Sequence, residues 1–123
     1  MKFSINFGIP EMRDLWLDLS EKANSNDLSE QERNLYQKWG RALRHLSLDP
    51  KYPGLNSHEI PQLTKRVGKK VWQSYLENRK SGAMRMYWVY GPQKQEITII
   101  GLASHPEDKK NDGYEKITLS SLT

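Results

Sequence analysis

The sequence predicts an α+β domain in which one strand and two amphipathic helices precede an antiparallel sheet. Apolar residues recur at three- and four-residue spacing in the N-terminal half, which indicates helices. Runs of strand composition separated by glycine-containing turns follow in the C-terminal half. A chain of 123 residues is long enough for one core. We therefore expect a single domain over 1–123, with two antiparallel helices on one sheet face and the other face free.

The first predicted elements are a short strand and a helix. In residues 2–7, Phe3, Ile5 and Phe7 alternate with polar residues, the pattern of a half-buried strand. Gly8 and Pro10 end this strand, and proline is well placed in the first turn of a helix. The apolar residues that follow are Met12, Leu15, Trp16 and Leu19. They predict a helix from about 10 to 23.

A second helix is predicted from its start and stop signals. Ser29 and Glu32 form a capping-box pattern, which satisfies free backbone amides at a helix start. Asp49 and Pro50 end the helix, because the residue before proline avoids helical geometry. The apolar stripe between these signals consists of Leu35, Trp39, Leu43 and Leu46.

The rest of the chain predicts a connector followed by three strands. Prolines and a glycine interrupt residues 51–68, which we interpret as an ordered loop anchored by Leu55 and Ile60. Strands are predicted at 69–76, 83–90 and 96–102, the first two forming a hairpin. Because strand side chains alternate, Arg85 projects opposite the face that carries Met84 and Met86. We expect that opposite face to be open to ligands.

The composition limits the chemistry. Nineteen Lys and Arg against fifteen Asp and Glu give a net charge of +4, which permits a polyanionic partner. The absence of cysteine excludes disulfides, thiolate metal sites and cysteine nucleophiles. The longest apolar run is too short to span a bilayer, and no basic-then-apolar signal segment begins the sequence. The expected location is the cytoplasm.

Candidate chemical groups are concentrated after the last predicted strand. His105, Lys109, Lys110 and Tyr114 lie within ten positions. Histidine exchanges a proton near neutral pH, lysine neutralises phosphate, and tyrosine stacks on a base or donates a proton. Together these groups suit phosphodiester cleavage without a metal. The alternative interpretation is a helix start or a turn at His105 and Pro106, with both lysines merely solvated.

Basic residues form the second signal. Lys65, Arg66, Lys69 and Lys70 flank Gly68 at the start of the predicted hairpin, and Arg79 and Lys80 lie at its turn. These residues could form one RNA-binding patch, although charge runs are usually only solvated surface. Arg85, inside an apolar strand, suits phosphate binding through its planar fork. A salt bridge from Arg85 to Glu77 or Glu96 is the alternative. The three histidines are far apart and show no metal-ligand spacing, so no metal or other cofactor is expected.

The stretches GLNSHEI, KKVWQSYLENRKSGAMRMYWVYGP and ITIIGLASHPEDKK, followed by GY, resemble the RelE/ParE superfamily of toxins from bacterial type II toxin–antitoxin systems. The resemblance covers about 2–119 and is most specific from 71 to 114. It implies a RelE-like fold. In the ribonuclease branch it implies an mRNA interferase that enters the ribosome and cleaves mRNA through attack of the 2′-hydroxyl on the adjacent phosphate.

The resemblance also assigns roles to residues. It matches Arg85 to the phosphate-binding arginine, His105 to the general acid or base, and Tyr114 to the C-terminal aromatic residue. Many members carry basic residues on the preceding strand, where this chain has Tyr75, Glu77 and Asn78. Two alternatives therefore stand: a ParE-like inhibitor of DNA gyrase, and a non-catalytic nucleic-acid or protein-binding module. An acidic antitoxin that folds on binding is the implied partner.

Overall fold

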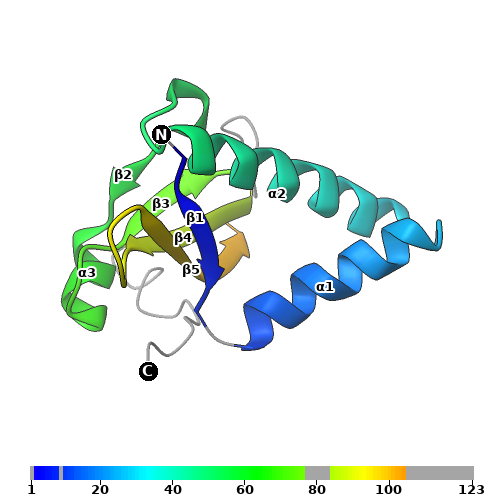
Figure 1. The fold of residues 1–123 in the computed structure, drawn as a ribbon, viewed down its shortest axis with the longest axis horizontal. Coiled ribbons are helices and arrows are strands. Elements are labelled where there is room, and N and C mark those ends of the chain that lie inside the picture. Colours follow the sequence, from blue (N-terminus) through cyan, green and yellow to red (C-terminus); the bar gives the residue numbers. More distant parts are fainter. Residues whose placement is uncertain (1, 9, 77–83, 105–123) are drawn as a thin grey trace.

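The protein consists of a five-stranded sheet with helices on both faces (Figure 1). The computed structural model describes residues 2–8, 10–76 and 84–104. Within them the order of elements is β1 (Ser4–Phe7), α1 (Pro10–Asn24), α2 (Glu30–Leu48), the 3₁₀ turn η1 (Pro53–Leu55), β2 (His58–Glu59), α3 (Pro61–Val67), β3 (Trp72–Tyr75), β4 (Met84–Tyr90) and β5 (Glu96–Ser104). The α+β class is therefore confirmed. No helix in these residues is long and apolar enough to cross a membrane.

The helical hairpin forms as its start and stop signals predict. Ser29 caps α2 with both hydrogen bonds of a capping box: the Glu32 amide donates to the Ser29 hydroxyl, and the Ser29 amide donates to the Glu32 carboxylate. The same carboxylate lies 2.7 Å from the Lys22 ammonium in the last turn of α1. The two helices are therefore joined by charge at the turn between them and by stacked rings of Trp16 and Tyr36 farther along.

The charge contact between the helices makes a pH-dependent prediction. Hydrogen bonding to Lys22, and then to the Ser29 amide, lowers the pKa of Glu32 from 4.5 to about 2. A lowered native pKa stabilises the fold above the ordinary pKa, and this contribution is lost as the pH falls toward 2. Glu32→Gln is therefore expected to lower the melting temperature slightly at pH 7, because the ion pair is exposed to solvent, and this difference should shrink as the pH falls through about 2. Glu21→Gln, at an exposed acid on α1, is the control; a difference independent of pH would contradict the prediction.

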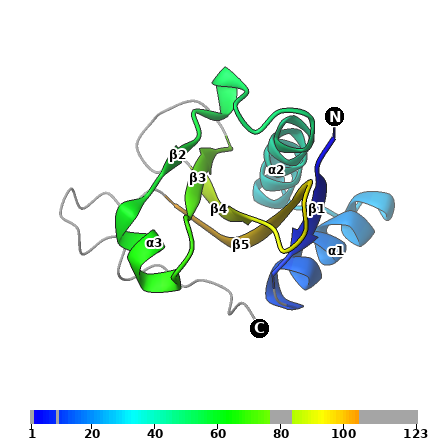
Figure 2. The ribbon, with the colours of Figure 1, turned by 60° about the vertical axis from the view of Figure 1, so that its left-hand side comes forward.

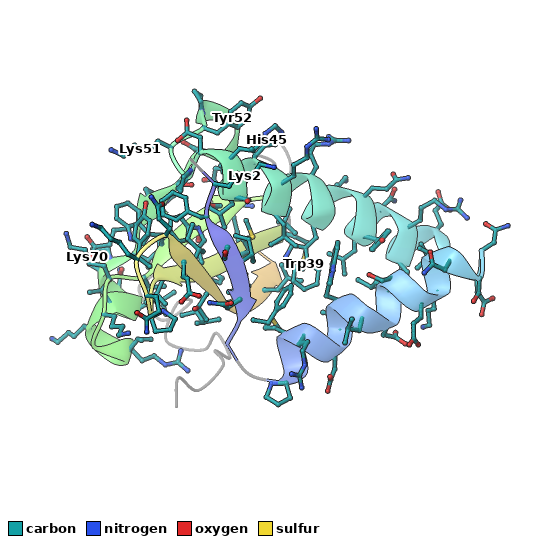
Figure 3. The ribbon with its side chains drawn as sticks, viewed as in Figure 1. Lys2, Trp39, His45, Lys51, Tyr52 and Lys70 are labelled. Atoms are coloured by element: carbon teal, nitrogen blue, oxygen red, sulfur yellow. The ribbon has the colours of Figure 1, made fainter. Side chains whose placement is uncertain are left out.

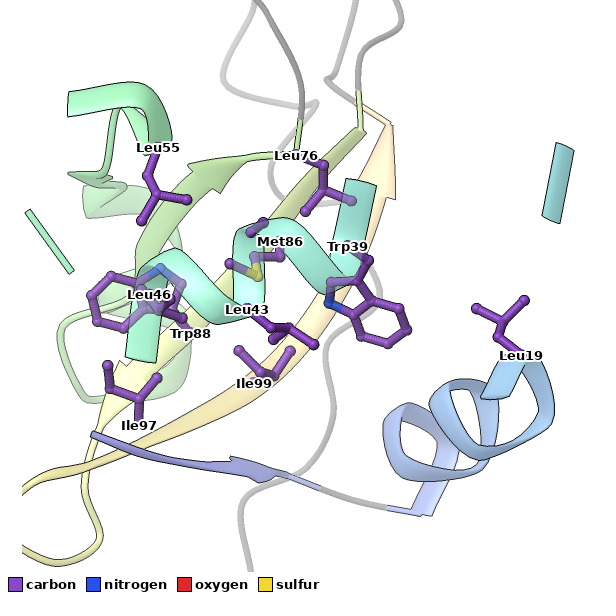
Figure 4. Close-up of a cluster of buried hydrophobic side chains, with 11 residues drawn as sticks. Leu19, Trp39, Leu43, Leu46, Leu55, Leu76, Met86, Trp88, Ile97 and Ile99 are labelled. Atoms are coloured by element: carbon purple, nitrogen blue, oxygen red, sulfur yellow. The ribbon is translucent and has the colours of Figure 1, made fainter. Parts of the chain in front are cut away.

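The main core lies between the helical hairpin and the sheet (Figure 4). The α2 stripe supplies Trp39, Leu43 and Leu46, which face the inner sheet side of Met86, Trp88, Ile97 and Ile99. Leu55 of η1 closes one end of this core and is 2% exposed. The predicted alternation of β4 is thus confirmed for the face that carries Met84 and Met86.

The sheet is mixed, and the expectation of an antiparallel sheet is wrong for one strand. The order is β1-β5-β4-β3-β2, with β3, β4 and β5 forming the predicted antiparallel meander. However, β1 pairs with β5 in parallel, with Ile5 opposite Ile97 and Phe7 opposite Ile99. Parallel strands need a long crossover. The helical hairpin and the strands after it provide that connection.

The connector at 51–68 is the second correction, because it holds η1, β2 and α3 rather than a loop. Pro61 begins α3 at a position where its missing amide costs nothing, and Gly68 ends the helix with a left-handed φ of 90°. Both predicted anchors, Leu55 and Ile60, are buried. Figure 2 shows α3 on the sheet face opposite α1 and α2.

The second sheet face is consequently not free. A smaller core forms beneath α3, and its buried members are Ile60, Leu63, Val71, Tyr87, Val89 and Ile100. Within α3, Leu63 and Val67 lie four residues apart on one helical side, which is why so short a helix covers apolar surface. Near the end of β3 and the start of β4, where Tyr75 is paired with Arg85, the same face carries polar side chains instead.

Candidate functional site

Four polar or aromatic side chains from three strands meet on the second sheet face. His58 of β2 is paired with Gln73 of β3, and Tyr75 of β3 is paired with Arg85 of β4. Paired residues share a face, and Gln73 is also paired with Tyr87, which belongs to the core beneath α3. We call His58, Gln73, Tyr75 and Arg85 the His58–Arg85 cluster.

His58 is held in a defined orientation. Its Nδ1 lies 3.1 Å from the backbone oxygen of Asn56, and a carbonyl oxygen can only accept, so Nδ1 carries the proton in the neutral ring. Its Nε2 lies 3.5 Å from the side-chain nitrogen of Gln73, which is a long contact in which the amide donates. The ring is exposed and makes an edge contact with Tyr75, with centroids 6.3 Å apart. This arrangement presents Nε2 as the basic atom of an accessible imidazole.

Arg85 lies on the predicted side of β4, but its expected exposure is wrong. The residue is 3% exposed, and its guanidinium carbon lies 3.7 Å from the centroid of the Tyr75 ring. Such a position over a ring face attracts the cation to the π-electrons. Because a guanidinium stays protonated in proteins, Arg85 places a cation at the base of the cluster.

The chain around the cluster is basic. Residues 58–76 contain four Lys or Arg and one acidic residue, Glu59, which accepts a hydrogen bond from Thr64. Lys65, Arg66, Lys69 and Lys70 are all exposed. Lys69 also lines a cavity of about 470 Å³ with Asn6, Gly8 and Thr98, and Lys70 lies beside α3 in Figure 3. The predicted positions Lys69 and Lys70 therefore border the same sheet face as the His58–Arg85 cluster.

Most of the other predicted site residues lie outside the described residues. These are Arg79, Lys80, His105, Lys109, Lys110 and Tyr114. Glu77, one alternative partner of Arg85, is also outside. In residues 2–8, 10–76 and 84–104, no group of three metal-ligating side chains occurs.

Sequence reasoning missed His58, Gln73 and Tyr75 as partners of Arg85. One signal was available, because 73 and 75 alternate with the apolar residues Trp72 and Leu76 and so belong to the face opposite them. His58 had no such signal. Its strand is two residues long, and only the pairing with β3 brings it to the cluster.

The fold and this cluster define an α+β protein with a mixed sheet and a basic polar site on one face. Comparison with protein-family models, with curated proteins and with solved structures gives no match for this chain.

Proposed function

We propose that this protein is the toxin of a type II toxin–antitoxin system and acts as a metal-independent, ribosome-dependent mRNA endoribonuclease. The observation that carries the proposal is the convergence of His58, Tyr75 and Arg85 from three strands on one sheet face. An imidazole can transfer protons and a guanidinium can stabilise developing negative charge, and phosphodiester cleavage without a metal depends on both contributions. The basic residues bordering this face suit the backbones of mRNA and rRNA.

The proposed reaction is attack of the 2′-hydroxyl on the adjacent phosphate. The attacking hydroxyl loses a proton, the bond from phosphorus to the 5′-oxygen breaks, and the leaving oxygen gains a proton. His58 Nε2 is the base for the first transfer, and His105, assigned by the resemblance, supplies the proton for the second. Arg85 stabilises the negative charge that develops on the phosphate, and Tyr114 stacks on or orients the base. Lys69, Lys70, Arg79, Lys80, Lys109 and Lys110 hold the RNA.

A cell-free translation reaction programmed with a reporter mRNA tests the activity. Wild-type protein at micromolar concentration is expected to cut the message during translation, leaving products with 5′-hydroxyl ends. Message that stays intact while translation proceeds normally would contradict the proposal. An acidic antitoxin added to the same reaction should suppress cleavage, since a chain that folds on binding can cover a basic face.

The burial of Arg85 favours a second candidate, a ParE-like inhibitor of DNA gyrase or a binding module without catalysis. A side chain that is 3% exposed has little surface for direct contact with a phosphate. In these alternatives the basic face binds its target by shape and charge alone. Uncut reporter mRNA together with inhibited supercoiling would assign the gyrase function. Uncut mRNA, normal supercoiling and no growth arrest on expression in a bacterium would assign the binding module.

A further inference from the structure

We propose that a second site, a cavity lined by aromatic rings beside η1, binds an unpaired base of a single-stranded nucleic acid. The cavity has a volume of about 360 Å³ and is lined by Lys51, Tyr52, Asn56, Trp72 and Tyr90, among others. It lies on the side of β3 that carries Trp72, opposite the His58–Arg85 cluster. The inference goes beyond the proposed function, because it requires binding of a base and no cleavage.

Exposed aromatic surface is concentrated at this cavity. Among the described residues, the large hydrophobic side chains that are exposed are Leu17, Leu48, Tyr52 and Tyr90. Both tyrosines line the cavity, and they are 40% and 42% exposed. Rings that face solvent around a hollow are the usual platform for bases of single-stranded nucleic acids, because every base has an apolar π-face.

These rings are held in place before any ligand binds. Tyr52 stacks on His45 with centroids 4.1 Å apart and 2° between the planes. Gly54 lies so near that a β-carbon there would come within 2.6 Å of the Tyr52 ring. Tyr90 packs edge-on against Trp72 and Trp88 with centroids 6.1 and 5.0 Å away. A preorganised site spends little binding energy on ordering its side chains.

The charge around the cavity favours a ligand that carries phosphate. Lys51 lines it, and Figure 3 shows Lys2 and His45 at the same end of the molecule. Asp49 is the nearby acid, and its carboxylate accepts a hydrogen bond from the Lys51 amide. Burial, and then Asp49, raises the pKa of Tyr90, and a tyrosine hydroxyl is in any case protonated at neutral pH. The hydroxyl of Tyr90 and the side chain of Asn56 can therefore bond to the polar edge of a base.

The connection to the His58–Arg85 cluster is short along the chain. Asn56 and Ser57 line the cavity, and His58 follows them directly on the edge strand β2. The Asn56 carbonyl also accepts the hydrogen bond from His58 Nδ1. A single-stranded nucleic acid that passes over this edge of the sheet can therefore reach both the aromatic cavity and the His58–Arg85 cluster.

Fluorescence anisotropy of a short, labelled 2′-O-methyl RNA oligonucleotide tests the inference, because this probe binds but cannot undergo attack by its 2′-oxygen. Tyr52→Leu and Tyr90→Leu should each weaken binding about tenfold to a hundredfold. An abasic oligonucleotide of the same length should bind the wild-type protein as weakly as the intact one binds these variants. Leu17→Ala, at an exposed apolar residue of α1, is the matched control and should leave binding unchanged.

Thermal melts of each variant separate lost binding from lost folding. If Tyr90→Leu melts early, Lys51→Ala keeps the test valid. Removing this exposed charge should weaken binding of the oligonucleotide and reduce the salt dependence of binding without changing the melt. Equal binding of the abasic and intact oligonucleotides would overturn the inference, as would unchanged binding by folded Tyr52→Leu and Lys51→Ala variants. Binding of a proline-rich peptide without any binding of the oligonucleotide would also overturn it and assign the cavity to a protein partner.

Discussion

Replacing Trp39 by alanine is expected to destabilise the protein by about 3 to 5 kcal/mol and to lower activity by increasing the unfolded fraction. Trp39 is fully buried at the centre of the main core, where its ring contacts Phe7 of β1 and Trp16 of α1 edge-on. It therefore joins α2 to both the sheet and α1. Domains of this size are stable by only about 5 to 15 kcal/mol, so the loss is a large part of the total.

Denaturant melts followed by circular dichroism measure this effect. Trp39→Phe is the matched variant: it keeps a ring, and the indole nitrogen that it removes has no hydrogen-bond partner within the described part of the chain. Trp39→Phe should lower the free energy of unfolding clearly less than Trp39→Ala does. Leu17→Ala, at a residue that is 51% exposed, should change stability by less than about 0.5 kcal/mol. Equal losses for all three variants would mean that α2 does not anchor the core as described.

Replacing His58 by alanine is expected to reduce RNA cleavage about a hundredfold to ten-thousandfold while leaving the melt nearly unchanged, if the proposed reaction is correct. The imidazole is exposed, so its removal opens no cavity in either core. A role in proton transfer should also alter the pH dependence of the rate, since one limb of the profile belongs to this group. Added imidazole should restore part of the activity. The His105→Ala variant should lose a similar factor.

Arg85 needs different variants, because it is 3% exposed and stacked on Tyr75. Arg85→Ala should both lower stability and abolish growth arrest, because the side chain is buried against Tyr75. Arg85→Met keeps an unbranched chain of similar length and removes the charge. If a folded Arg85→Met variant and a folded His58→Ala variant both remain fully toxic, the cluster takes no part in the activity, and the gyrase-inhibitor alternative becomes the better account.

Elements whose causes are local can be predicted from the order of amino acids alone. The capping box of Ser29 and Glu32, the stop at Asp49 and Pro50, and the 3.6-residue apolar stripe all act within a few positions along the chain, so the two helices were predicted nearly to the residue. The period of two in β4 likewise assigned Met86 and Arg85 to opposite faces. The strand composition of β3, β4 and β5 predicted their meander.

Features that depend on contacts between distant segments become visible only in the folded protein. A strand's period of two does not say which neighbour it pairs with, so the parallel pairing of β1 with β5 was not predictable. The helix α3 is too short to show a periodic stripe, and β2 becomes a strand only through its pairing with β3. For this reason the burial of Arg85, the arrival of His58 beside Tyr75 and the aromatic cavity at Tyr52 and Tyr90 were all outside sequence reasoning. Each arises where residues far apart in the chain share one small volume.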